Sequence, residues 1–127
     1  GLTGDPKKQL PNVLSTGLNS DPRVVHRIQN DPANLHHLTV GILQNEIKGA
    51  YFLREHLTGF KDPLLFLQGQ KDGLIDYHDS LEAYAMIASN DKELHVYSSL
   101  MHNIFDEPQR KWDIYSEVVQ WINRHRY

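Results

Sequence analysis

Two residues of this 127-residue chain have the chemistry and the placement of an acid–base pair. Asp72 follows a short run of bulky residues, Pro63–Leu67, and His102 follows an alternating segment, Lys92–Ser98. A carboxylate that accepts a hydrogen bond from imidazole Nδ1 fixes the tautomer of the ring and leaves Nε2 free as a general base. Such a pair supplies two of the three members of a nucleophilic triad, so Asp72 and His102 are the candidate catalytic residues.

The segments that precede Asp72 and His102 are expected to be neighbouring parallel strands. An uninterrupted apolar run bounded by turn residues is typical of a strand that is buried on both faces of a parallel sheet. Gly69 then allows the backbone to turn, and Asp72 lies just beyond the carboxyl end of the strand. Because ligands bind at that edge of open α/β sheets, we expect the two side chains to lie within reach of each other.

Four helices are expected around these strands. The first begins at Asp21-Pro22, an N-cap followed by proline. It is expected to be short because a second Asp-Pro boundary signal follows at Asn30-Asp31-Pro32. A helix from about residue 39 to residue 56 is expected to close with Gly59 as its C′ residue. Asp76 is the expected N-cap of a helix over residues 77–89. The last helix is expected from residue 108 or 109 to residue 123.

The order of these elements predicts an α/β fold with a parallel pair of strands. Residues 1–18 are expected to be an irregular lead-in with a short strand at Asn12–Ser15. The apolar residues expected to face the core are Val40, Leu43, Ile47, Ala50, Tyr51 and Leu57 in the long helix, Leu81, Tyr84, Ala85 and Ala88 in the third, and Trp112, Tyr115, Val118, Val119 and Ile122 in the last. Two strands are too few for a stable sheet, so another segment completes the sheet or the chain is part of a larger one.

Composition places the chain among globular proteins, with 39% hydrophobic and 23% charged residues. The net charge is −3 with both signs interspersed, which argues against a nucleic-acid partner. The lack of cysteine excludes disulfides and thiol nucleophiles and fits a cytoplasmic location, free or peripheral to membranes. No apolar run approaches the roughly 18 residues of a transmembrane helix. The chain opens at Gly1 without a signal-peptide pattern, so we expect a processed or excised product.

Longer motifs carry a resemblance to a known family. The motifs are Asp21-Pro22 and Asp31-Pro32, the stretch from Pro63 to Asp76, the tetrapeptide from Asp91 to Leu94, the loop from Met101 to Glu107, and Trp121. Together they resemble the monoacylglycerol lipase and lysophospholipase (serine aminopeptidase-like) group of α/β-hydrolases. The resemblance runs from about Asn12 to His125, nearly the whole chain.

The resemblance implies the C-terminal part of an α/β-hydrolase fold, with residues 19–60 as a helical cap and residues 61–127 as core. Asp72 then matches the triad acid and His102 the triad base. Leu74 and Asn103 would line the acyl pocket. The implied activity is hydrolysis of monoacylglycerols, lysophospholipids or similar small lipid esters, with no metal or organic cofactor.

One part of the family pattern is missing from this sequence. The family's nucleophile lies on a Gly-x-Ser-x-Gly turn upstream of the cap, and none of the serines, at positions 15, 20, 80, 89, 98, 99 and 116, has that context. The upstream oxyanion-hole loop is missing as well. We therefore expect the C-terminal half of a longer hydrolase, inactive by itself, whose sheet is completed by the missing N-terminal half or by a second copy.

Other interpretations compete with the catalytic one. From the residues alone, Asp72 is a turn aspartate that binds loop N–H groups, and His102 is one of eight histidines. Asp76 and Asp79 are helix-start residues and rank behind Asp72 as triad acids. The spacing of the histidines does not support a metal site. The alternative function is a non-catalytic α/β module for binding or dimerisation.

Overall fold

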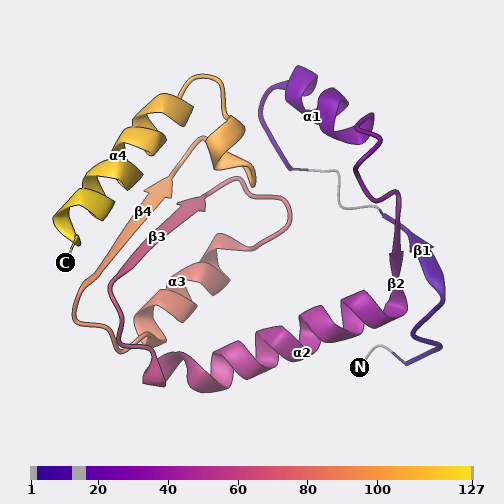
Figure 1. The fold of residues 1–127 in the computed structure, drawn as a ribbon, viewed down its shortest axis with the longest axis horizontal. Coiled ribbons are helices and arrows are strands. Elements are labelled where there is room, and N and C mark those ends of the chain that lie inside the picture. Colours follow the sequence, from indigo (N-terminus) through magenta and orange to yellow (C-terminus); the bar gives the residue numbers. More distant parts are fainter. Residues whose placement is uncertain (1–2, 13–16, 127) are drawn as a thin grey trace.

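The computed structural model describes residues 3–12 and 17–126 (Figure 1). In chain order its elements are β1 (Gln9–Pro11), α1 (Pro22–Gln29), β2 (His37–Thr39), α2 (Val40–His56), a 3₁₀ turn (Leu57–Gly59), β3 (Leu64–Gly69), α3 (Tyr77–Met86), β4 (Lys92–Tyr97), a second 3₁₀ turn (Ile104–Asp106) and α4 (Lys111–Arg124). None of the described helices is both long and apolar enough to cross a membrane.

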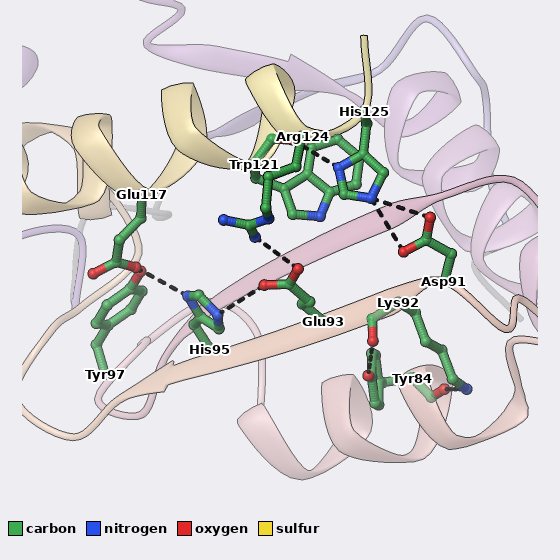
Figure 2. A network of polar contacts seen from close by, with 10 residues as sticks. All are labelled: Tyr84, Asp91, Lys92, Glu93, His95, Tyr97, Glu117, Trp121, Arg124 and His125. Carbon is green, nitrogen blue, oxygen red and sulfur yellow. Dashed lines mark hydrogen bonds and ion pairs between the residues drawn. The ribbon is translucent and has the colours of Figure 1, made fainter. Parts of the chain in front are cut away.

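The centre of the fold is the parallel pair β3–β4. Its register runs from Leu64 opposite Lys92 to Gly69 opposite Tyr97, so both strands end at the same edge. Helix α3 lies on one side of the pair and α4 on the other (Figures 1 and 2). The predicted parallel strands and the helix between them are therefore confirmed.

The expected burial of the first strand on both faces is wrong. Residues 64–67 are only half-buried, and β3 pairs with β4 alone among the described residues. The chain turns directly after Gly69, at Gln70 and Lys71, although Gly69 itself has no positive φ. A Cβ atom at Gly69 would lie 2.3 Å from the carbonyl oxygen of Met101 and 2.6 Å from that of Leu100. The position requires glycine because the loop of His102 passes directly over it.

Helix starts follow the expected capping chemistry. The Asp21 carboxylate accepts a hydrogen bond from the Arg23 N–H, and the Asp76 carboxylate accepts one from the His78 N–H. The expected C′ role of Gly59 is wrong: α2 ends at His56, a 3₁₀ turn follows, and Gly59 has no positive φ. Helices α3 and α4 are shorter than expected, since α3 ends at Met86 and α4 begins at Lys111.

The lead-in contributes one strand to a small second sheet, in which β1 pairs antiparallel with β2 from residues 37–39. Residues 13–15 of the strand expected at Asn12–Ser15 lie outside the described residues; the observed strand lies just before them, at Gln9–Pro11. Its register sets Leu10 opposite Leu38. This small sheet brings the start of α2 next to the lead-in, where the Val40 N–H donates to the Lys8 carbonyl oxygen.

Several apolar stripes expected in the core are exposed. Trp112, Val119 and Ile122 on α4 are 71%, 54% and 46% exposed, and Tyr51 on α2 is 67% exposed. Ala85 and Ala88, expected on the inner face of the third helix, are exposed as well. The small buried cluster on this side consists of Tyr97, Leu100, Ile104 and Ile114. Periodicity identifies an apolar face, but it does not identify the segment that covers it, and no described residue covers these faces.

Hydrogen bonds and an ion pair between polar side chains connect α4 to β4 (Figure 2). The Glu117 carboxylate accepts hydrogen bonds from the Tyr97 hydroxyl at 2.5 Å and from His95 Nδ1 at 3.0 Å. Arg124 pairs with Glu93 at 2.8 Å. Burial opposes ionisation of Glu117, but the hydrogen bonds from Tyr97 and His95 outweigh it and lower the pKa of Glu117. The helix is therefore held to the strand by a charged network as well as by Ile114.

Candidate active site

The Asp72 carboxylate lies just beyond the end of β3 and is held by four hydrogen-bond donors. Oδ1 accepts from the backbone N–H groups of Leu74, at 2.8 Å, and Ile75, at 3.0 Å. Oδ2 accepts from Gln68 Nε2 at 3.3 Å and from His102 Nδ1 at 2.9 Å. The side chain is only 6% exposed, so these donors replace most of its contact with water. The backbone bonds fix one oxygen, and the other faces the imidazole.

Asp72 is held in its ionised form. Burial alone would raise its pKa, but the hydrogen bonds from the Ile75 N–H, the His102 ring and the Leu74 N–H outweigh burial. The pKa of Asp72 is therefore lowered below its usual value. A carboxylate of this kind accepts from Nδ1–H and stabilises a positive charge on the ring when the imidazole takes up a proton.

His102 lies in the loop after β4 and is half-exposed, with 37% of its side chain accessible. Because the Asp72 oxygen accepts, Nδ1 of the ring is the donor, and Nε2 remains to accept a proton. The predicted meeting of the two loops at one sheet edge is thus observed, over a separation of 30 residues. Asp76 and Asp79 are not part of this contact: Asp76 caps α3 and binds His78.

The segment that precedes α1, residues 17–20, joins the two loops. The carbonyl oxygen of Gly17 accepts from the N–H of Gly73 in the loop after β3 and from the N–H of His102 in the loop after β4, each at 3.2 Å. Gly17 has a φ of +72°, and a Cβ atom there would lie 2.3 Å from Gly73 Cα. The close approach and the left-handed backbone both require glycine. This junction was missed from the sequence, because an isolated glycine carries no signal of its partner.

A cavity of about 440 Å³ opens beside this junction. It is lined by Leu18, Leu74, His102 and Asn103 from the junction and the two loops, and by Asn12, Ile28, Gln29, Asn34, Leu35 and His36 from the lead-in, α1 and the turn after α1. Leu74 and Asn103, the predicted pocket residues, both reach it. The lining mixes amide and imidazole groups with aliphatic ones, so it offers contacts to an apolar chain and to a polar group together.

A second polar pair, Gln68 and Ser80, supports Asp72 and was also missed from the sequence. Gln68 and Ser80 are 6% and 5% exposed, and the Ser80 hydroxyl donates to Gln68 Oε1 at 2.7 Å. Gln68 Nε2 donates to the Gly69 carbonyl oxygen at 2.8 Å as well as to Asp72. Both ends of the amide are thereby fixed, and its N–H points at the carboxylate. The Ser80 hydroxyl is thus a structural group in this chain.

The parallel sheet, its crossover helix and the helical segment before it define part of an α/β-hydrolase fold. The crystal structure of a monoacylglycerol lipase from Paleococcus ferrophilus matches with a TM-score of 0.82 at 22% identity, over 95% of this chain and 48% of that one. A soluble variant of monoglyceride lipase from Saccharomyces cerevisiae, in complex with a substrate analog, matches with a TM-score of 0.85 at 20% identity, over 96% and 43%.

The chain belongs to the serine aminopeptidase S33 family, whose sequence profile matches residues 5–109. It is also 33% identical to a monoacylglycerol lipase of Mycolicibacterium smegmatis over 116 aligned residues. The alignment covers 90% of this chain and 41% of that protein. The chain therefore spans less than half the length of these relatives. The family and the fold expected from the sequence are both confirmed.

Proposed function

We propose that this chain supplies the acid and the base of a serine carboxylic-ester hydrolase that acts on monoacylglycerols or similar small lipid esters. The observation that carries the proposal is the 2.9 Å contact between His102 Nδ1 and the buried Asp72 carboxylate at the carboxyl edge of the sheet. The mixed cavity beside His102 supports a substrate with an apolar chain and a polar head. Leu74 and Asn103 are its proposed pocket residues, and residues 19–60 its proposed cap.

In the proposed reaction His102 works as the general base and then as the general acid. Its Nε2 takes the proton of a serine hydroxyl while the serine oxygen attacks the ester carbonyl carbon. Asp72 stabilises the imidazolium, which then gives its proton to the leaving alcohol as the carbon–oxygen bond breaks. Water repeats the sequence on the acyl-enzyme and releases the fatty acid. The serine comes from a segment outside residues 1–127, because this sequence has no Gly-x-Ser-x-Gly turn.

The exposed surfaces of the core agree with an active site whose serine comes from another segment. Among the described residues β3 has an unpaired edge, and α4 exposes an apolar face with Trp112 and Val119. We propose that the N-terminal half of the hydrolase fold pairs with β3 and covers this face. A second copy of the chain is the competing occupant. Sedimentation of residues 1–127 tests it, since a stable dimer would favour the second copy.

The direct test is release of fatty acid from monoacylglycerol by the full-length protein. His102→Gln is expected to abolish release, because glutamine does not accept the serine proton. His78→Gln is the matched control: His78 is an exposed histidine on α3, and its loss is expected to leave the rate unchanged. A full-length protein that neither hydrolyses esters nor reacts with a fluorophosphonate would contradict the proposal and favour a non-catalytic module.

A further inference from the structure

Glu107 is the most deeply buried charged residue among the described residues, with 1% of its surface exposed. It lies five residues after His102 in the segment that follows β4, which carries the proposed base and is called the base loop below. Its Oε1 accepts from the backbone N–H of Ser20 at 3.1 Å and from that of Met101 at 3.2 Å. Its Oε2 accepts from the Ser20 hydroxyl in a very short contact. A buried carboxylate is costly unless donors surround it, and these three donors come from two segments.

The two segments that Glu107 joins are the two that hold the backbone of His102. Ser20 ends the cap-entry segment, residues 17–20, in which the Gly17 carbonyl oxygen accepts from the His102 N–H at 3.2 Å. In the same segment, the Leu18 carbonyl oxygen accepts from the Asn103 N–H at 2.7 Å. Met101, on the other side, immediately precedes His102. The carboxylate therefore fixes the cap-entry segment and the base loop to each other on both sides of the histidine.

The acid of the pair shares one contact with this segment, the hydrogen bond from the Gly73 N–H to the Gly17 carbonyl oxygen, but Asp72 has donors of its own. Asp72 is fixed by the N–H groups of Leu74 and Ile75 and by Gln68, none of which touches Glu107 in the hydrogen bonds of the site. Loss of the Glu107 carboxylate would thus loosen His102 more than Asp72, because Asp72 keeps the donors of Leu74, Ile75 and Gln68. A group of this kind affects the alignment of the base, and alignment controls the rate of the chemical step.

We propose that Glu107 is a positioning residue for His102, acting through Ser20 and Met101. The proposal rests on the proposed function only for its kinetic consequence. Its structural consequence, that the carboxylate fixes the base loop against the cap-entry segment, stands on the three hydrogen bonds. Through the same bonds, displacement of the cap entry would be transmitted to the base.

The kinetic test compares Glu107→Gln with Asp106→Asn in the full-length protein. Glutamine keeps the size of the side chain but removes its charge. The Ser20 and Met101 N–H groups then lose their charged acceptor, and the Ser20 hydroxyl must turn to accept from the new NH₂ group. We expect kcat for monoacylglycerol to fall about 10- to 100-fold, with KM changed less than about twofold. Asp106 is the neighbouring acid, exposed and paired with Arg27, and Asp106→Asn is expected to leave both constants unchanged. Equal kcat in Glu107→Gln and wild type, with a lower Tm, would overturn the proposal.

Amide hydrogen exchange provides a readout that does not require activity. Glu107→Gln is expected to speed exchange of the His102 N–H about tenfold or more, while exchange within β3 and β4 stays at the wild-type rate. Ser20→Ala removes one hydrogen bond, keeps the fold, and is expected to give the same local change at smaller size. Unchanged His102 exchange in Ser20→Ala, or acceleration spread equally over β3 and β4, would overturn the proposal. An inert wild-type enzyme would refute the proposed function alone, because the exchange result still decides the role of Glu107.

Discussion

Replacement of Asp72 by asparagine tests the acid–base pair with little change of shape. The carboxylate now accepts from four donors, two on each oxygen. Asparagine has a single acceptor oxygen. If that oxygen stays with the Leu74 and Ile75 N–H groups, the new NH₂ group faces Gln68 Nε2 and His102 Nδ1, which are donors. The ring must then present an unprotonated Nδ1 to residue 72, so its proton lies on Nε2. An imidazole that is protonated on Nε2 cannot accept the serine proton there.

The wrong tautomer sets the size of the expected effect. In a serine protease of another fold, the equivalent change lowers kcat about 10⁴-fold, and we expect a loss of about 10³- to 10⁴-fold for Asp72→Asn. That loss corresponds to about 4 to 5.5 kcal/mol of transition-state stabilisation. The stability cost is smaller, about 1 to 3 kcal/mol, because the donors on Oδ2 lose a charged acceptor.

The assay is hydrolysis of a monoacylglycerol by the full-length enzyme, with kcat and KM measured separately. Asp76→Asn is the matched control: asparagine is a good N-cap, so α3 stays capped and the rate should stay within about twofold of wild type. If Asp72→Asn kept more than about a tenth of the wild-type kcat, or if Asp76→Asn lost as much, the assignment of Asp72 as the acid would be wrong.

Three further predictions concern the surroundings of the pair. Gly69→Ala is expected to cost about 3 kcal/mol in the free energy of unfolding, because its Cβ would meet two carbonyl oxygens of the base loop; denaturant unfolding measures it, and a neutral result would contradict the close approach. Ser80→Ala is expected to lower kcat about 3- to 10-fold with KM unchanged, since the amide of Gln68 loses one of its fixed ends; an unchanged kcat would show that the amide needs no such support. The pKa of His125 is raised by its hydrogen bonds to a backbone carbonyl one turn earlier and to Asp91. The contribution of His125 to the stability of the fold is therefore full below about pH 6.5 and is lost as the pH rises through the raised pKa. The stability difference between wild type and His125→Asn should therefore be larger at pH 5.5 than at pH 8.5, and an equal difference would refute this linkage.

The elements that the sequence predicts well are those set by local chemistry. Asp21 and Asp76 start their helices as N-caps because the cap bond joins residues two positions apart. The strands β3 and β4 follow from an apolar run and an alternating one, and parallel pairing then brings Asp72 and His102 to one edge. The contact between Asp72 and His102 could thus be predicted from residue types and strand order, whereas their proposed roles as acid and base depend on the family resemblance.

The features that the sequence does not predict depend on contacts between distant segments. Gly17 and Gly73 touch across 56 positions, and the bonds between Ser20 and Glu107 span 87. Neither contact leaves a periodic or capping signal. The prediction that the apolar stripe of α4 is buried is wrong for a related reason. The spacing of the stripe is that of a core face, but the surface that would cover it is not among the described residues. The missed residues surround the predicted pair.

The most direct test of the acid–base assignment is the intact mass of the full-length protein after reaction with a fluorophosphonate, with wild type and His102→Gln treated side by side. The wild type is expected to gain one adduct, on a serine outside residues 1–127. His102→Gln is expected to remain unlabelled over the same time, because no base activates the serine. Equal labelling of both proteins, or an adduct on a serine within this chain, would contradict the account.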